Sequence, residues 1–392
     1  MRVLFYDDAP EFGGHETMTL AAVRHLAQQP DMALGCMFFR GNLRLSQQIT
    51  DLAARCPRLE PMPQDYASRQ FQFLRTLLSF RAIRRMAQVM KAFRPDVVVV
   101  AQGAIAFGSA GLMAAKKAGL PTISYIPMTH PETLFSASRL KAALREPVNR
   151  LYYRLPDEYI TISPRMEDYL RRHGMRQRVT VVKVAVDLAA CHAVDRAEAR
   201  AKWGLAADDW VIALVGRVQF WQKRQDLAIQ GLALARQKLP KLKLLVVGDG
   251  PDLDTLKALV AAEGVADSVI FTGWTAGLSA VYSAIDALVI PSRYEGVPLV
   301  MIEAMYFRRP VVAAAVDGMM DTLPPHWLFP SGDAPAFAAR LVEVAGAHED
   351  ALLDAHRQRV VDSHALPVFE RDFMTALVSA AHRIGRPPGS VA

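Results

Sequence analysis

Cysteine is scarce in this sequence, and the few cysteines present form no framework. The 392 residues include three of them, Cys36, Cys56 and Cys191, which lie far apart and show no C-x-x-C spacing. An odd, scattered set excludes a fold held together by disulfides and a zinc site built from cysteines. We therefore expect the protein to work in a reducing compartment, the cytoplasm.

Long hydrophobic runs are equally scarce. One uncharged run, residues 97–115, is almost long enough to cross a bilayer, but it contains Gln102 and three glycines. These interruptions favour a buried strand, a loop and then a small-residue helix from Gly108 to Ala118. The chain also reaches Asp7 and Asp8 too soon for the apolar region of a signal peptide.

Two common phosphate-binding fingerprints are missing as well. The P-loop pattern is absent, and the stretch GDGPDL is only a partial G-x-G-x-x-G with Leu253 in the last position. A nicotinamide dehydrogenase is therefore disfavoured. Asp252 and Asp254 stand where a helix begins, and acids there complement the helix dipole, so we expect no metal site.

The sequence is rich in apolar β-type runs that alternate with helical patterns. Apolar residues make up 52% and charged residues 22%, which is typical of a globular protein, and the length favours two domains. Several runs lack polar alternation, as expected for parallel strands covered on both faces. The runs are RVLFYD, MALGCMFF, DVVVV, TISYI, YITIS and VTVVKV, then VIALVG, LKLLVVG, VIFTG, DALVI and PVVAAA.

This rhythm predicts an α/β protein of two doubly wound, Rossmann-like domains. A polar, alanine-rich connector at about residues 184–209 separates them. We expect an N-terminal, acceptor-side domain over 1–187 and a C-terminal, donor-binding domain over 188–365. Residues 366–392 are expected to form a helix returning to the N-terminal domain, followed by a frayed tail.

Charge is distributed unevenly. Residues 1–187 hold 26 Lys and Arg against 16 Asp and Glu, whereas the remainder holds 20 against 23. A basic half indicates an anionic partner; we do not expect a nucleic acid. Residues 69–94 contain seven basic residues and no acid. Two interpretations stay open: a basic amphipathic helix on an anionic membrane surface, and a core-packed helix with a solvated basic face.

Loops that follow predicted strands carry the candidate binding residues. Gly13 and Gly14 either bring backbone amides to an anion or make a plain turn. The loop GRVQFWQKRQ carries Arg217 and Lys223, with Arg224 as a third cation. Cations this close repel one another unless they are solvated or face an anion, and a diphosphate suits them.

The stretch RYEGVPLVMIEAM places Glu295 before a turn and Glu303 inside an apolar helix. Pro298 can begin that helix, whose free amides would then face phosphate oxygens. Carboxylates are repelled by phosphates but accept hydrogen bonds from hydroxyls. A nucleotide sugar, with hydroxyls at both ends and charge in the middle, fits this spacing; the alternative is that Glu303 is a buried structural acid.

Together these segments resemble a known family. GRVQFWQK, VVGDGP, FTGW, PSRYEGVPLVMIEAM and RPVVAA are similar to the family-4 retaining glycosyltransferases of GT-B fold, most strongly over residues 210–325. The resemblance implies two Rossmann-like domains facing a central cleft, a nucleoside diphosphate sugar as donor and a glycan or lipid-linked acceptor. No cofactor and no metal are implied.

The resemblance also implies roles for individual residues. Arg217 and Lys223 would hold the donor diphosphate, Glu295 would contact the donor sugar, and Glu303 would contact the ribose. His130, in YIPMTHPE, would stand beside the reacting sugar and complete the catalytic set of Glu295, Arg217 and Lys223, although a lone histidine is more often structural. The other donor-binding residues implied are Gly14, Gly273, Trp274, Gly296, Val297 and Pro298.

Three departures from the family pattern are visible. Six positions separate Arg217 from Lys223 where five are commoner, and Arg224 stands where relatives often have glycine. The run VVKVAVD replaces the usual proline-asparagine-glycine before Val-Asp. The last departure concerns the geometry of the linker more than the chemistry.

The expected function is retaining transfer of a sugar to an acceptor hydroxyl, in the synthesis of a cell-surface glycan or glycolipid. A nucleotide-sugar epimerase or hydrolase of the same fold is one alternative. A non-catalytic nucleotide-sugar-binding partner is another. The expected location is the cytoplasm, with contact at the inner face of a membrane left open.

Overall fold

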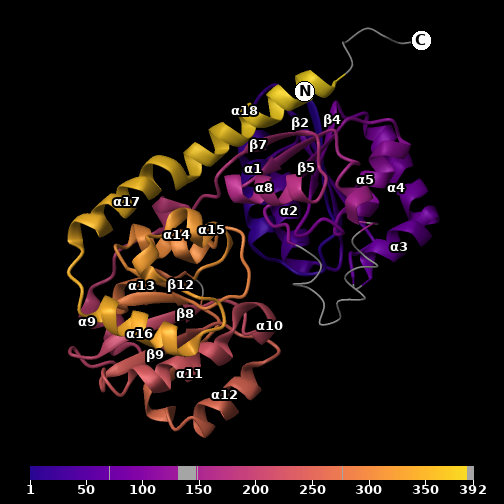
Figure 1. Cartoon of the computed structure of the whole chain (residues 1–392). Helices are drawn as coiled ribbons and strands as arrows, with labels where there is room; N and C mark the ends of the chain where they lie inside the picture. The colour runs from indigo at the N-terminus through magenta and orange to yellow at the C-terminus, as the bar shows by residue number, and fades with distance from the viewer. Residues whose placement is uncertain (70, 131–146, 148, 276, 386–392) are drawn as a thin grey trace. The chain divides into compact units, whose positions relative to one another are not determined.

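The structure, a computed structural model, describes residues 1–69, 71–130, 147, 149–275 and 277–385. The predicted frayed tail, 386–392, lies outside the described residues. The chain folds as two compact units, one formed by Met1–Val184 together with Pro367 onward, the other by Ala185–Leu366. Each is an α/β unit with helices on both faces of a sheet (Figure 1).

Unit 1 is built on a seven-stranded parallel sheet. Its strand order is β3-β2-β1-β4-β5-β6-β7. The central strand β4 is fully buried, which explains its uninterrupted valines. The strands are β1 (Arg2–Asp7), β2 (Ala33–Phe39), β3 (Leu59–Gln64), β4 (Val97–Ala101), β5 (Thr122–Tyr125), β6 (Glu158–Thr161) and β7 (Arg178–Val181).

The helices of unit 1 connect successive strands and cover the sheet, except for the last one, which comes from the end of the chain. Those within the described residues are α1 (Gly14–Ala27), α2 (Leu43–Arg55), α3 (Gln72–Leu78), α4 (Phe80–Phe93), α5 (Ser109–Lys117), α8 (Pro164–Arg172) and α18 (Leu366–Ile384).

Helix α18 supplies part of the core of unit 1. Phe373 is 1% exposed, and its ring centroid lies 6.5 Å from that of Phe5 on β1 and 5.6 Å from that of Tyr125 on β5. Near its end, Arg383 makes two hydrogen bonds of 2.7 Å to the carboxylate of Glu158 on β6. Aromatic packing and a two-point ion pair therefore hold α18 to this sheet.

Unit 2 repeats the same plan. Its six parallel strands have the order β10-β9-β8-β11-β12-β13, so the first strand again lies between the second and the fourth. The strands are β8 (Trp210–Val215), β9 (Leu242–Val247), β10 (Val269–Gly273), β11 (Ala287–Ile290), β12 (Val311–Ala314) and β13 (Leu328–Phe329).

The helices of unit 2 include three short 3-10 turns. They are η1 (Leu188–Ala190), α9 (Arg196–Ala201), α10 (Phe220–Lys223), α11 (Gln225–Ala235), α12 (Leu253–Ala262), η2 (Ala266–Ser268), α13 (Ser279–Ala284), α14 (Leu299–Tyr306), α15 (Asp317–Thr322), η3 (Pro325–Trp327), α16 (Ala334–Ala345) and α17 (Asp350–His364). The prediction of two doubly wound α/β domains is confirmed.

Strand β3 was not predicted, because its sequence LEPMPQ contains two prolines. Pro61 and Pro63 are two residues apart and therefore direct their ring nitrogens to the same side of the strand. β3 is the edge strand and, among the described strands, pairs with β2 alone. Proline is tolerated there because the side without donors faces away from the partner strand.

The single helix expected within residues 69–94 is wrong. The segment forms two helices, α3 and α4, which meet at Ser79. The Ser79 side chain donates to the carbonyl of Arg75 at 2.6 Å, and its amide bonds to the carbonyl of Thr76. Local bonding of this kind competes with the helical ladder and ends α3. Among the described helices, none is both long and apolar enough to span a bilayer.

Candidate functional site

The strongest candidate site lies at the carboxyl edge of the unit 2 sheet, where β8 neighbours β11. In doubly wound sheets the loops diverge at such a reversal of strand order and leave room for a ligand. The loop after β8 carries Arg217 and leads through α10 to Lys223, and the loop after β11 carries Glu295. The fold thus brings together residues more than 70 positions apart in the sequence.

The centre of this site is an ion pair between Lys223 and Glu295. The Lys223 ammonium lies 2.6 Å from Oε1 of Glu295. The Glu295 side chain is 8% exposed and that of Lys223 is 25% exposed. The glutamate is therefore almost out of water and depends on the lysine for compensation, while the lysine still reaches solvent.

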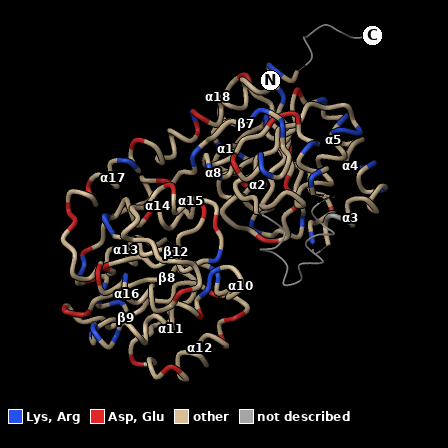
Figure 2. The backbone as a smooth tube through the Cα atoms, viewed as in Figure 1, with Lys and Arg blue, Asp and Glu red and all other residues tan. Residues whose placement is uncertain are grey.

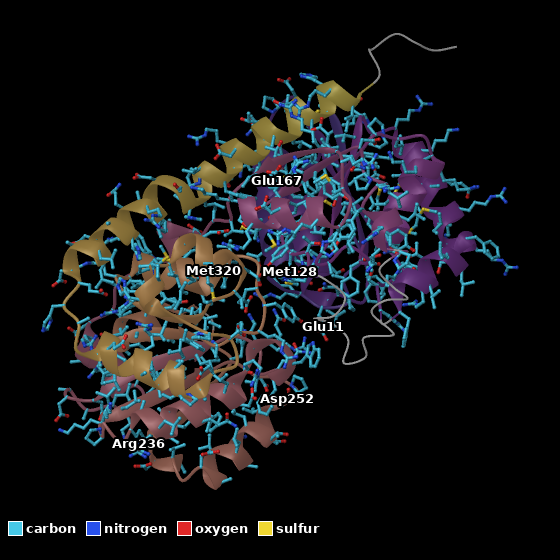
Figure 3. The ribbon with its side chains drawn as sticks, viewed as in Figure 1. Glu11, Met128, Glu167, Arg236, Asp252 and Met320 are labelled. Carbon is cyan, nitrogen blue, oxygen red and sulfur yellow. The ribbon has the colours of Figure 1, made fainter. Side chains whose placement is uncertain are left out.

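Helix α10 is fixed at both ends, which places Lys223. Asp252, labelled in Figure 3, accepts a hydrogen bond of 2.7 Å from the backbone amide of Phe220. The amide of Arg293 in the β11 loop donates to the carbonyl of Gln222 at 2.8 Å. The Arg293 guanidinium also lies 4.3 Å from the ring centre of Trp221. These contacts tie the β8, β9 and β11 loops to one another.

Two glycines allow the loops to approach this closely. A Cβ at Gly248 would lie 2.1 Å from the carbonyl oxygen of Gly216. A Cβ at Gly318 would lie 2.4 Å from the carbonyl oxygen of Gly296. Since real Cβ atoms do not come so near to backbone, only glycine fits at either position.

Asp317 positions Glu295, and sequence reasoning did not find it. Its Oδ2 accepts a hydrogen bond of 2.7 Å from the amide of Glu295, and both groups are buried. Asp317 has φ of 48°, a left-handed conformation that costs energy for a residue with a side chain. No motif marks this aspartate, because its partner lies 22 positions earlier and on another loop.

The turn before α14 offers backbone donors beside the ion pair. Within the described chain, the amides of Gly296, Val297 and Leu299 have no hydrogen-bond acceptor. Pro298 caps the helix but has no N–H, so the first backbone donor of α14 is the amide of Leu299. The start of a helix with open amides favours an anion.

Glu303 lies on α14 and is held by a tyrosine. Its Oε2 accepts a hydrogen bond of 2.7 Å from the hydroxyl of Tyr282 on α13. Burial raises the pKa of Glu303, and the bond from Tyr282 partly offsets that rise. The carboxylate keeps further lone pairs for hydroxyl donors. Tyr282, like Asp317, was not found by sequence reasoning.

Arg224, the third cation of the loop, forms an ion pair outside the Lys223–Glu295 site. Its Nε lies 3.1 Å from Oδ1 of Asp226, two residues along the chain. Its φ of 54° is left-handed, a conformation that glycine adopts more readily than arginine. Arg217 is exposed and lies two residues beyond the end of β8. Gly273 ends β10, on the same edge of the sheet, and the next residue, Trp274, exposes 67% of its surface.

The remaining predicted residues belong to unit 1, which is described by itself. Gly14 is the first residue of α1, beyond the carboxyl end of β1, and open space surrounds the position of a Cβ there. His130 follows β5 and is 4% exposed, and its ring centre lies 5.7 Å from that of Tyr169. The structure thus divides the predicted residues between the two units.

Beside Gly14 lies a cluster of buried charges that was not predicted as a unit. Glu16 Oε2 accepts a bond of 2.7 Å from the Gly13 amide, which closes the start of α1. His15 Nε2 lies 3.0 Å from Glu16 Oε1 and 3.8 Å from Asp7 Oδ2. Asp7, His15 and Glu16 each offer one atom that could bind a metal ion, and these three atoms lie within 4.8 Å of one another.

Burial and mutual charge shift the titration of this cluster. Burial raises the pKa of Asp7 to about 7, although His15 lowers it. Burial opposes the charge on His15, but Glu16 and Asp7 outweigh that effect and raise the pKa of His15 to about 9. The histidine is therefore the internal cation that allows two carboxyl groups to be buried together.

The comparisons with known proteins agree with this fold. Residues 209–346 match the family model described as glycosyl transferases group 1, and residues 13–185 match that of the glycosyl transferase 4-like domain. The chain is 30% identical over 294 residues to the 2-deoxystreptamine N-acetyl-D-glucosaminyltransferase of Streptomyces fradiae, covering 72% of this chain and 68% of that protein.

Two further likenesses are informative. The chain is 34% identical over 224 residues to the D-inositol 3-phosphate glycosyltransferase of Mycobacteroides abscessus, and the match spans about half of each, 54% and 49%. The solved structure of Anabaena HepE in complex with UDP-glucose covers 97% of this chain and all of its own, with a TM-score of 0.76 and 18% identity. At that identity it speaks for the fold alone.

Fold and sequence together define a glycosyltransferase of the two-domain GT-B class. Within that class, the chain belongs to the family-4 glycosyltransferases.

Proposed function

We propose that this glycosyltransferase moves a sugar from a nucleoside diphosphate sugar to an acceptor hydroxyl with retention of anomeric configuration. The observation that carries the proposal is the Lys223–Glu295 pair, which lies at the strand reversal beside the open amides of the α14 turn. That arrangement offers positive charge for a diphosphate and a carboxylate for the hydroxyls next to it. HepE, which shares the fold, was solved with UDP-glucose bound, and we propose a donor of the same class for this chain.

The ammonium of Lys223 has three donors, so it can remain on Glu295 and also contact a phosphate oxygen. The carboxylate of Glu295 then accepts hydrogen bonds from hydroxyls of the transferred sugar. Arg217 contributes a second cation, and the amides of Gly296 and Val297 contribute dipoles. Glu303, oriented by Tyr282, takes the ribose hydroxyls.

The remaining donor contacts complete this assignment. Gly273 and Trp274 lie beside the base. From unit 1, the family resemblance assigns Gly14 to the diphosphate and His130 to the reacting sugar. These four assignments rest on the family resemblance together with positions just after strands.

In the chemical step the bond from the anomeric carbon to the phosphate oxygen breaks, and its electron pair goes to the diphosphate. Lys223, Arg217 and the turn amides stabilise the charge that develops there. The same phosphate oxygen accepts the proton of the acceptor hydroxyl, whose oxygen bonds to the anomeric carbon on the face that the diphosphate leaves. Because side chains supply the cations, we expect the transfer rate to be unchanged by EDTA.

The acceptor is proposed to be a glycan or a lipid-linked glycan intermediate, in cytoplasmic synthesis of a cell-surface glycan or glycolipid. The basic residues of 1–187 support an anionic acceptor. A cyclitol is the second candidate acceptor, because the Streptomyces fradiae and Mycobacteroides abscessus relatives are named for 2-deoxystreptamine and D-inositol 3-phosphate.

The test begins with thermal shifts against UDP- and GDP-sugars, followed by transfer assays with lipid-linked, glycan and cyclitol acceptors. The product's anomeric configuration is read by NMR. Retention, with turnover that requires an acceptor, is expected. Conversion of donor alone would instead indicate an epimerase or hydrolase, and tight donor binding without turnover on any acceptor would indicate a non-catalytic partner.

A further inference from the structure

Two carboxylates and one imidazole converge where β1 ends and α1 begins. Asp7 is the last residue of β1, and His15 and Glu16 lie in the first turn of α1. One imidazolium compensates only one of two ionised carboxylates, so a negative charge stays uncompensated in a buried place. A dication beside a neutral imidazole would balance both carboxylates.

Each carboxylate is held through one oxygen, which leaves the other oxygen for a ligand. The amide of Ala9 donates to Asp7 Oδ1 at 2.9 Å, and the amide of Gly13 donates to Glu16 Oε2 at 2.7 Å. The second oxygens, Asp7 Oδ2 and Glu16 Oε1, are the ones that face His15 Nε2. Hydrogen bonds of this kind orient the carboxylates that ligate metal ions.

The Asp7 carboxylate is buried with one oxygen unsatisfied. The side chain is 7% exposed, and within the part of the chain that the structure describes its Oδ2 accepts no hydrogen bond. Such an oxygen is costly unless a cation or a donor reaches it. The neighbouring Asp8 differs, because the hydroxyl of Ser68 and the amide of Gly108 both donate to its carboxylate. Asp7 therefore has a binding capacity that Asp8 lacks.

The spacing of the three ligand atoms suits tetrahedral coordination. Zinc binds imidazole nitrogen and carboxylate oxygen at about 2.0–2.2 Å, so two ligand atoms of a tetrahedral site lie about 3.3–3.6 Å apart. His15 Nε2 lies 3.0 Å from Glu16 Oε1 and 3.8 Å from Asp7 Oδ2, on either side of that range. The third pair of ligand atoms lies within 4.8 Å. Modest side-chain movements would bring all three atoms to one ion.

A fourth ligand and a route from solvent are also provided. Zinc sites with three protein ligands take a water as the fourth. A cavity of about 20 Å³, lined by Asp7 and Thr19 among others, has room for one water. Thr19 Oγ1 is buried and has no hydrogen-bond partner among the described residues, so it can hold that water. The His15 side chain is 15% exposed, which gives an ion access.

We propose that Asp7, His15 and Glu16 bind one dication of the zinc class (Zn²⁺, Co²⁺ or Ni²⁺), which displaces the proton of His15 to solvent. One nitrogen with two carboxylates favours these ions over Mg²⁺ and Ca²⁺, which prefer more oxygen ligands. General attraction of cations does not account for such binding, because residues 1–187 are basic overall and Figure 2 shows Lys and Arg along α4. The ion takes no part in the proposed transfer, whose cations belong to unit 2.

The test is a titration of the full chain, freed of metal with EDTA and then dialysed, with CoCl₂ followed by ZnCl₂. Cobalt reports its own coordination through visible absorption, and we expect one equivalent that zinc displaces. Asp7→Asn and His15→Gln should each weaken binding at least about 100-fold, since loss of an outer contact alone costs roughly 10- to 100-fold. Asp7→Asn keeps an acceptor for the amide of Ala9 and removes a buried charge, so it should fold as the wild type does.

Matched controls come from two other pairs of histidine and carboxylate. His25 Nδ1 lies 3.4 Å from Glu370 Oε2, and His326 Nε2 lies 2.7 Å from Glu349 Oε1. Among the described ion pairs, each of these histidines faces a single carboxylate. His25→Gln and His326→Gln should therefore bind cobalt as the wild type does. MgCl₂ and CaCl₂ should not displace the cobalt.

Binding should stabilise unit 1 in particular, because the ion joins the end of β1 to the start of α1. At a zinc concentration about 100-fold above its Kd, the melting temperature seen by circular dichroism should rise by roughly 5–10 °C. The transition seen by tryptophan fluorescence should stay in place, because all the tryptophans lie in unit 2. Asp7→Asn should show no rise.

Three results would overturn the proposal. One is cobalt binding by Asp7→Asn and His15→Gln with the affinity of the wild type. Another is loss of binding in His25→Gln or His326→Gln, which would identify an adventitious ion only. The third is no binding of cobalt or zinc at millimolar concentration. The transferase assay is a separate measurement, so failure here leaves the proposed function standing.

Discussion

The ion pair between Lys223 and Glu295 makes a quantitative prediction possible for Lys223→Ala. Removing one partner of a fully buried pair costs about 3–5 kcal/mol. Since the Lys223 side chain is 25% exposed, water can partly replace it, and we expect a loss of about 2 kcal/mol in the free energy of unfolding. For a unit of this size that corresponds to a melting temperature lower by roughly 4–8 °C.

The effect on catalysis should be larger than the effect on stability. Loss of one group that stabilises developing charge lowers kcat by roughly 100- to 1,000-fold. The assay is release of nucleoside diphosphate in the presence of acceptor, with the exposed Lys238→Gln as control. A second measurement separates the two roles: in a Glu295→Gln background, Lys223→Ala should cost less than about 1 kcal/mol of stability, because no buried charge is left unpaired.

The reasoning would be refuted by a Lys223→Ala variant whose kcat stays within threefold of the wild type while its stability falls as predicted. The lysine would then be a structural partner of Glu295 and have no part in charge stabilisation. A stability loss that persisted unchanged in the Glu295→Gln background would contradict the ion-pair explanation itself.

Three further predictions concern other contacts. Tyr282→Phe removes the hydroxyl that donates a hydrogen bond to Glu303. In steady-state kinetics it should raise the KM for the nucleotide sugar about three- to tenfold and leave kcat nearly unchanged. An equal fall in kcat would contradict this prediction. Phe373→Ala should destabilise unit 1 by about 3–5 kcal/mol. The unfolding transition seen by circular dichroism should then shift. The transition seen by tryptophan fluorescence should stay in place, because all the tryptophans lie in unit 2. The pKa of His15, raised to about 9, lies above its ordinary value of 6.5. The stabilisation by the charged His15 is therefore complete below pH 6.5 and is lost as the pH rises through 9. Urea unfolding should show the free energy of unfolding fall by roughly 3 kcal/mol over that range, and His15→Gln should abolish the fall.

The sequence predicts those elements of the fold whose signal is local. Strands such as β4 and β8 are unbroken apolar runs because helices cover both of their faces, and that pattern is visible without a structure. β3 escaped detection because its two prolines are acceptable only at a sheet edge, and the position of an edge depends on the whole topology. The break between α3 and α4 also escaped detection, since helical spacing alone does not show the hydrogen bond that Ser79 makes to Arg75.

The site shows the same division between local and tertiary information. Loops after strands indicated Lys223 and Glu295, and the fold brings these two side chains together. Asp317 and Tyr282 were not indicated, because their importance arises from bonds to residues 21 or 22 positions away on other elements. A residue can position a neighbour in this way only after the folded sheet has brought their two loops or helices side by side.

The origin of α18 at the far end of the chain has a consequence for biosynthesis. On the ribosome, the first 184 residues emerge long before the helix that covers Phe5 and Tyr125. Until Phe373 has been translated, the nascent N-terminal sheet presents aromatic surface to water, and it invites chaperones or aggregation. Unit 1 is thus synthesised first but completes its core last, and in a chain that ends before residue 366 its aromatic surface stays exposed.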